Sequence, residues 1–222
     1  MDIILQEFKT PGNIGAVARV MRNFDFHNLV LVNPQCDHLD FKARQRAKNA
    51  LEVLENARVV DKLNYDTLIG TTSVVGSDYN LRRNSITPEQ LAKLDLQGNV
   101  GLIIGREGDG LSKEELEACD ILVTIQNSPN YHAMNVSHAL AIILYELFKV
   151  NDKEKLGDKT IYATRIEKDK LMEFLEEKIK QLNFLDENKE KTQIIVWKKL
   201  IGKANLTKRE AMVLFGFLKK LK

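Results

Sequence analysis

Short aliphatic runs that alternate with longer helical segments are the feature that most restricts the fold of this chain. The runs that predict strands lie at residues 3–5, 29–32, 59, 67–72, 100–104 and 121–125. The segments that predict helices between them lie at about 13–24, 41–55, 113–118 and 135–149. The strands lack a clean apolar–polar alternation, which is typical of strands buried on both faces. The sequence therefore predicts an α/β fold, in which a mostly parallel sheet has helices on both faces.

Beyond residue 150 the pattern contains helices alone. Residues 151–160 are polar and predict a linker between a first domain, residues 1–150, and a small all-helical domain, residues 161–222. Apolar residues at helical spacing predict three amphipathic helices in this second domain. Because about 70 residues form only a thin core, we expect these helices to pack on the first domain or on a second copy of the chain.

The two predicted domains carry opposite net charges. Residues 1–150 contain 15 Lys and Arg against 19 Asp and Glu, a net charge of −4. Residues 151–222 contain 18 against 12, a net charge of +6. A basic tail fits a polyanionic partner, and a solvated lysine-rich surface accounts for the charge equally well.

The cysteines and the apolar runs restrict the compartment. Cys36 and Cys119 form no disulfide framework and match no metal-ligand spacing, so we expect buried thiols in a reducing compartment. The four histidines form no cluster typical of a metal site. No N-terminal segment resembles a signal peptide, and no apolar run approaches the roughly 18 residues of a membrane-spanning helix. The sequence therefore predicts a cytoplasmic protein with no metal site and no membrane function.

A glycine-rich loop at residues 105–112 connects an expected strand to an expected helix. Its three glycines let the backbone approach a ligand closely. The glycine spacing matches that of a nucleotide-phosphate loop, but Leu111 stands where that loop has its lysine. Glu107 and Asp109 would also repel phosphates. The loop therefore favours a cationic or neutral ligand.

Two further segments place asparagine where a loop enters a helix. The first covers residues 11–19 and contains Asn13 and Arg19, and the second covers residues 127–135 and ends at Asn135. Spacing alone favours a surface salt bridge for Arg19 and a helix cap for Asn135.

Together the three segments resemble the signature motifs of the SPOUT methyltransferase superfamily, in its TrmH/TrmJ-type branch. Asn13-Ile14-Gly15 with Ala18-Arg19 is similar to the first motif, and residues 105–111 are similar to the second. Residues 128–135 with Ser137-His138-Ala139 are similar to the third. The tail, at residues 163–165 and 205–210, resembles the C-terminal extension of TrmJ-like enzymes.

This resemblance implies an RNA 2'-O-methyltransferase that uses S-adenosylmethionine and works as a homodimer. The implied substrate is a ribose in the anticodon loop of tRNA, of the cytidine 32 type. The resemblance also implies a C-terminal trefoil knot in the first domain, which strand and helix patterns would not predict. The alternatives are another tRNA position, ribosomal RNA, a noncatalytic RNA-binding protein of this fold, and a phosphate-loop nucleotidase.

The resemblance further assigns residues to the site. The implied donor-binding residues are Thr71, Thr72, Gly105, Arg106, Glu107, Gly108, Ile125, Ser128, Met134 and Asn135. The implied catalytic residues are Arg19, Asn13, Glu107 and Asn135, with Arg19 as the usual activator of the ribose hydroxyl. Because a guanidinium is a poor base, we expect Arg19 to clamp the phosphate beside the ribose and to stabilise alkoxide charge.

Two other features bear on the substrate. Ala133-Met134 stands where many family members have Ser followed by Leu, so position 133 offers no hydroxyl. Basic residues that extend the RNA surface are expected at Lys42, Arg44, Arg46 and Lys48. Their two-residue spacing lets at most two of them share a helix face, and we expect half of them to be solvated surface.

Overall fold

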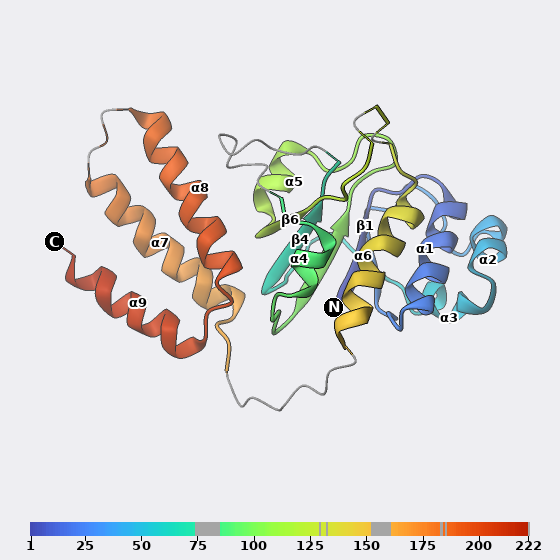
Figure 1. The fold of residues 1–222 in the computed structure, drawn as a ribbon, viewed down its shortest axis with the longest axis horizontal. Coiled ribbons are helices and arrows are strands. Elements are labelled where there is room, and N and C mark those ends of the chain that lie inside the picture. Colours follow the sequence, from blue (N-terminus) through green and yellow to red (C-terminus); the bar gives the residue numbers. More distant parts are fainter. Residues whose placement is uncertain are drawn as a thin grey trace.

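A six-stranded parallel sheet forms the centre of the fold (Figure 1). The computed structural model describes residues 1–73, 85–128, 130–131, 133–151, 161–182, 184 and 186–221. The strands are β1 (Asp2–Gln6), β2 (Leu29–Val32), β3 (Arg58–Val60), β4 (Thr67–Thr71), β5 (Val100–Ile104) and β6 (Ile121–Val123). They lie in the order β3-β2-β1-β5-β4-β6, and each neighbouring pair is parallel. The predicted parallel sheet is therefore confirmed.

Helices cover both faces of the sheet, most of them on one face. The larger core lies beneath α1 (Pro11–Asn23), α2 (Phe41–Ala47), α3 (Leu51–Glu55), α4 (Pro88–Ala92) and α6 (Val136–Asn151). A short 3-10 turn, Lys48–Ala50, joins α2 to α3. Helix α5 (Lys113–Ala118) and the segment 61–66 cover a smaller core on the other face.

The two cores explain the uninterrupted apolar strands. Ile3 and Leu5 of β1 are buried in the larger core, and Ile4 between them is buried in the smaller one. Successive side chains of a strand point to opposite faces, so a strand covered on both sides needs apolar residues at every position.

Capping boxes mark the starts of two helices. Ser112 Oγ accepts a hydrogen bond from Glu115 N (3.2 Å), and Glu115 Oε2 accepts one from Ser112 N (2.7 Å). Thr87 forms an equivalent capping box before α4, with Pro88 at the first helical position. These caps fix where the glycine-rich loop ends and α5 begins.

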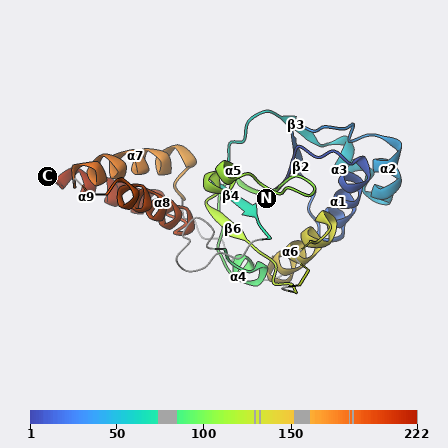
Figure 2. The same ribbon diagram turned by 90° about the horizontal axis from the view of Figure 1, so that it is seen from above.

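Three further helices form a tail beside the β6 edge of the sheet (Figures 1 and 2). They are α7 (Arg165–Gln181), α8 (Glu187–Lys203) and α9 (Lys208–Lys220). Their shared core is small and consists of Leu171, Met172, Leu175, Ile179, Ile201 and Leu218. The expected linker begins at Asn151, which belongs to α6, and its other residues, 152–160, lie outside the described residues.

Arg165 at the start of α7 joins the tail to the sheet. Its backbone N donates to Asp66 Oδ1 (2.6 Å), and its Nη1 donates to Asp120 Oδ2 (3.0 Å). Lys168 is 5% exposed and donates to the Asp66 carbonyl (3.3 Å), and burial lowers its pKa. Asp66 and Asp120 directly precede β4 and β6, so the tail docks near the N-terminal ends of these strands. We expected the tail helices to pack on the first domain or on a second copy of the chain. In the structure they contact the first domain of the same chain.

Both cysteines are free thiols. Cys119 is buried, and this burial raises the pKa of its thiol to about 12. Cys36 is half-buried, and burial also raises its pKa. Within the described ranges, no helix has the length and apolar content to cross a membrane.

Candidate active site

A cavity of about 560 Å³ opens at the C-terminal ends of β4, β5 and β6. Parallel α/β sheets commonly bind ligands at this edge, and the volume suits a small organic molecule. The lining residues come from the three motif segments, from the strand ends and from α6. They are Asn13, Thr71, Thr72, Ser73, Ile104, Gly105, Arg106, Glu107, Gly108, Gly110, Val123, Ile125, Asn127, Tyr131, Ala133, Met134, Asn135, Val136, Ala139 and Ile143.

The glycine-rich loop folds back on itself at the cavity wall. Arg106 and Gly110 exchange two backbone hydrogen bonds, of 3.0 and 2.9 Å. A Cβ added to Gly105 would lie 2.1 Å from the Gly110 carbonyl carbon, so no side chain fits there. Gly108 and Gly110 have φ of +92° and +72°, which other residues rarely adopt. The glycines are therefore required for the turn that brings this backbone to the cavity.

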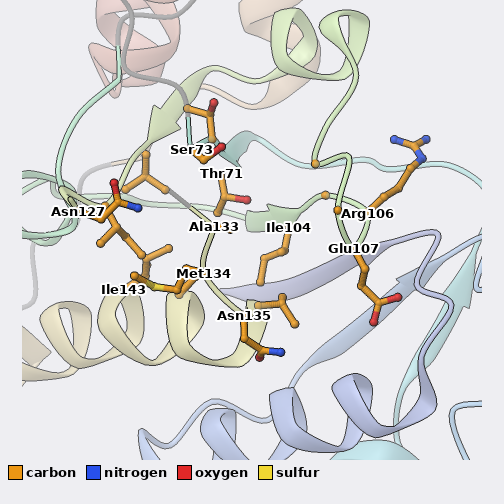
Figure 3. Close-up of a pocket in the computed structure, with 18 of the residues that line it drawn as sticks. Thr71, Ser73, Ile104, Arg106, Glu107, Asn127, Ala133, Met134, Asn135 and Ile143 are labelled. Carbon is orange, nitrogen blue, oxygen red and sulfur yellow. The ribbon is translucent and has the colours of Figure 1, made fainter. Parts of the chain in front are cut away.

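Glu107 connects the glycine-rich loop to the start of α1. Its Oε2 accepts hydrogen bonds from Lys9 N (2.8 Å) and Thr10 N (3.1 Å), and its Oε1 accepts one from Asn13 Nδ2 (2.5 Å). Figure 3 shows the Glu107 side chain pointing toward α1. Three donors occupy most of the capacity of one carboxylate. These contacts hold the first and second motif segments together.

Asn135 connects the third motif to the first. Its Oδ1 accepts hydrogen bonds from Ser137 N (2.9 Å) and Ser137 Oγ (2.8 Å), which caps the start of α6. Its Nδ2 donates to Asn13 Oδ1 at 3.4 Å. The helix cap expected from spacing is confirmed, and the same side chain reaches the candidate site. Asn13 thus lies between Glu107 and Asn135.

The Arg106 side chain turns away from the cavity (Figure 3). Its guanidinium forms paired contacts of 2.8 and 3.0 Å with Glu7, and paired contacts of 2.8 and 2.9 Å with Glu115. These hydrogen bonds raise the pKa of Arg106 and lower the pKa of Glu7. Arg106 therefore contributes its backbone to the cavity wall, while its charge is neutralised outside.

Comparison with protein families identifies the three motif segments as parts of one known domain. The model of the SpoU rRNA Methylase family matches residues 1–145. The chain belongs to this family. The expected SPOUT-type α/β fold is thereby confirmed, and membership implies the trefoil knot as well. In the structure, Ile86 exchanges backbone hydrogen bonds with Leu122 (2.8 Å) and Thr124 (2.9 Å), so the chain after β4 borders the segment that leads from β6 into the third motif.

Relatives of this SpoU-family chain match it along nearly its whole length, including the tail. The tRNA (cytidine-2'-O-)-methyltransferase TrmJ of Methanocaldococcus jannaschii is 36% identical over 227 residues, covering 99% of this chain and 98% of the relative. The tRNA (cytidine/uridine/adenosine-2'-O-)-methyltransferase TrmJ of Pseudomonas aeruginosa is 31% identical over 237 residues, covering 97% and 91%. The crystal structure of TrmJ from Z. mobilis ZM4 superposes with a TM-score of 0.72 at 25% identity, covering 99% of this chain and 98% of that one.

Most of the expected site residues line the SpoU-family cavity. Nine of the expected donor-binding residues do so, namely Thr71, Thr72, Gly105, Arg106, Glu107, Gly108, Ile125, Met134 and Asn135. Asn13 joins them from the first motif. The roles assigned to these residues stay predictions.

Arg19 and Ser128 lie outside the cavity lining. Arg19 is exposed on α1, and among the described residues it forms no ion pair, so the surface salt bridge favoured by spacing is not found there. Ser128 is exposed, and its Oγ accepts a hydrogen bond from Asn130 N (3.3 Å) in a turn. Two other residues of the third motif, Pro129 and His132, are not among the described residues.

Part of the cavity wall was not expected from the sequence. Ser73 lines it directly after the two threonines at the end of β4, a position that the strand end could have indicated. Val136, Ala139 and Ile143 line it from α6, where their spacing of three and four residues places them on one face. In the part of the chain that the structure describes, no group of three or more His, Cys, Asp or Glu is placed to hold a metal ion.

Proposed function

We propose that this chain methylates a ribose 2'-hydroxyl in the anticodon loop of tRNA, with cytidine as a target base and S-adenosylmethionine as the donor. The observation that carries this proposal is the junction of the three motif segments at one cavity through Asn13, Glu107 and Asn135. The full-length relatives named above are tRNA 2'-O-methyltransferases whose names share cytidine, which supports the same reaction here.

The cavity fits the donor in size and in charge. Ile104, Val123, Ile125 and Ile143 provide apolar walls for a planar base, and Thr71 lies at the polar end of β4. Because the Arg106 guanidinium is held outside the cavity by two carboxylates, it is not available to bind a phosphate inside the cavity. A cationic sulfonium ligand without phosphates suits this lining better than a nucleotide does.

The reaction requires orientation and the removal of one proton. When bound, S-adenosylmethionine would supply a methyl group on a sulfonium, and the bond from this methyl to the 2'-oxygen would form in line as its bond to sulfur breaks, with S-adenosylhomocysteine as the leaving group. We propose that the glycine-rich backbone and the residues around Met134 hold the donor, while Asn13 and Asn135 orient the ribose. Because Glu107 already accepts three hydrogen bonds, it positions Asn13, and a phosphate of the RNA or water takes the proton.

Arg19 acts on the RNA in this proposal. It follows Asn13 by six residues, about 9 Å along α1, and is exposed to solvent. A guanidinium in that place can bind the phosphate next to the target ribose with two hydrogen bonds, and stabilise charge on the attacking oxygen.

We also propose that the chain forms a homodimer through α6. Ile142, Tyr145 and Phe148 are 39%, 50% and 38% exposed, and Phe24 of α1 packs against both aromatic rings at 6.2 and 6.0 Å. Exposed apolar side chains that gather on one helix favour an interface. Replacing Tyr145 by Glu is expected to produce monomers in sedimentation equilibrium, and an unchanged dimer would contradict this interface. A cytoplasmic location, expected from the free cysteines, belongs to the same proposal.

Transfer of radiolabelled methyl groups from S-adenosylmethionine tests the function. Unmodified tRNA transcripts and ribosomal RNA fragments serve as parallel substrates, and the labelled nucleotide is then mapped. The proposal expects label on an anticodon-loop ribose of tRNA. Label on ribosomal RNA alone would favour the alternative substrate, and donor binding without any transfer would favour a noncatalytic RNA-binding protein.

A further inference from the structure

Helices α1 and α2 pack side by side next to the candidate site (Figures 1 and 2). A Cβ added to Gly15 would lie 2.0 Å from the Ala43 carbonyl oxygen, so the two helices are in close backbone contact. A Cβ added to Gly12 would lie 3.8 Å from both Cγ and Nε of Arg46. The helices are therefore antiparallel, and the Arg46 side chain lies beside the first turn of α1, which also contains Asn13.

Three basic side chains follow this seam. Arg19 lies one turn after Gly15 on the same side of α1, and Lys42 lies one turn before Arg46 on the same side of α2. All three are exposed. We call Arg19, Lys42 and Arg46 the cation strip.

The cation strip is free to bind an external anion. Within the described part of the chain, no side chain of the strip forms an ion pair or a hydrogen bond. Its acidic neighbour Asp40 is engaged as the α2 cap, where its side chain accepts from Lys42 N at 2.7 Å. Arg44, on another side of α2, instead donates its Nε to the Leu39 carbonyl (2.8 Å).

We propose that the cation strip binds the phosphates of the substrate RNA next to the target nucleotide, with Lys42 and Arg46 as positioning residues. This inference rests on the proposed function. Arg46 lies beside Gly12 in the first turn of α1, which also contains Asn13, and Arg19 lies about 10 Å farther along α1 from Gly12. Arginine binds a phosphate with two parallel hydrogen bonds, and lysine adds a point charge.

The position of Arg46 in the last turn of α2 offers a purely structural explanation, since a cation there stabilises a helix C-terminus. That effect does not require Lys42, which is in the first turn of α2, or Arg19 on another helix. Both lie along the same seam, as a phosphate-binding strip requires.

The double variant Lys42→Ala with Arg46→Ala tests the strip. We expect its KM for tRNA to rise about tenfold. We also expect the slope of log affinity against log salt to become shallower by about one to two, which corresponds to the loss of one to two phosphate contacts. The affinity for S-adenosylmethionine, measured by calorimetry, stays unchanged because neither side chain lines the cavity. Lys62→Ala is the matched control, since Lys62 is exposed in the segment that covers the opposite face of the sheet.

Filter binding of tRNA without donor separates this inference from the proposed function. If the wild-type protein binds tRNA but does not methylate it, the proposed function fails. The cation strip is then tested by the tRNA affinity of the double variant relative to that of the wild type. If the double variant folds and binds the donor as the wild type does, yet keeps the wild-type tRNA affinity and salt slope, the strip is disproved. Failure of the wild type to bind tRNA would overturn both.

Discussion

Among single residues, Glu107 has the most consequential contacts, because it joins segments that are more than 90 positions apart in the chain. A Gln at this position keeps one oxygen but turns an NH₂ group toward a group that itself donates a hydrogen bond. Glu107→Gln is therefore expected to destabilise the fold by about 1–3 kcal/mol and to lower kcat together with stability. Urea unfolding and single-turnover rates measure the two effects. A large loss of rate with unchanged stability would instead make Glu107 a group that acts directly in the reaction.

Arg19 permits a test that depends on geometry more than on charge. Arg19→Lys keeps the positive charge and removes the planar pair of donors. If Arg19 clamps a phosphate with two hydrogen bonds, the variant should lose methyl-transfer activity by orders of magnitude while it still binds the donor. Near-full activity in kcat/KM measurements would show that a bidentate contact is not needed.

Glu7 links residue chemistry to pH. Its hydrogen bonds with Arg106 lower the pKa of the Glu7 carboxyl in the folded chain, below the unfolded value of about 4.3. A lowered folded pKa stabilises the fold above the unfolded pKa, and this contribution disappears as pH falls through the folded pKa. The stability difference between the wild type and Glu7→Gln should therefore be constant above about pH 5 and shrink below about pH 4. A difference that grows on acidification in denaturant titrations would refute the assignment.

At the scale of elements, the packing of α1 depends on glycine. Gly15→Ala places a methyl group against the Ala43 carbonyl and should destabilise the chain by about 2 kcal/mol or more, because backbone must move. Gly216 in α9 provides the matched control, since nothing lies within 4 Å of a Cβ added there. Gly216→Ala should stabilise the chain by up to about 1 kcal/mol through helix propensity. Thermal unfolding of the two variants should shift in opposite directions, and equal shifts would contradict the close contact between α1 and α2.

Local patterns predicted the elements better than their contacts. The expected helix at 113–118 agrees with α5, and apolar runs mark the strands, because helical spacing and apolar runs are local signals. The pairing of Arg106 with Glu7 joins positions 99 apart, and no local pattern encodes it. For the same reason the sequence could not show that the Arg106 side chain turns away from the cavity. The resemblance identified about half of the cavity wall, and Arg19 and Ser128 lie outside it.

At the scale of the whole molecule, the site and the tail docking contacts lie toward opposite ends of the strands. The cavity opens at the C-terminal ends of β4 and β6, and Arg165 fixes the tail to Asp66 and Asp120 at their N-terminal ends. The charge asymmetry of the sequence fits a polyanionic partner for the tail, but the place where the tail docks depends on partly buried contacts of Arg165 and Lys168 that composition does not encode.

In the proposed function, the cavity directs a methyl group to a ribose 2'-oxygen. Two synthetic anticodon stem-loops that differ only in a single 2'-hydroxyl at the mapped target nucleotide test it most directly. Incubated with the protein and labelled S-adenosylmethionine, the ribose version should gain one methyl group, and the 2'-deoxy version should gain none. Equal labelling of the deoxy version would place the methyl group on the base or on another nucleotide, and would contradict methylation of the ribose.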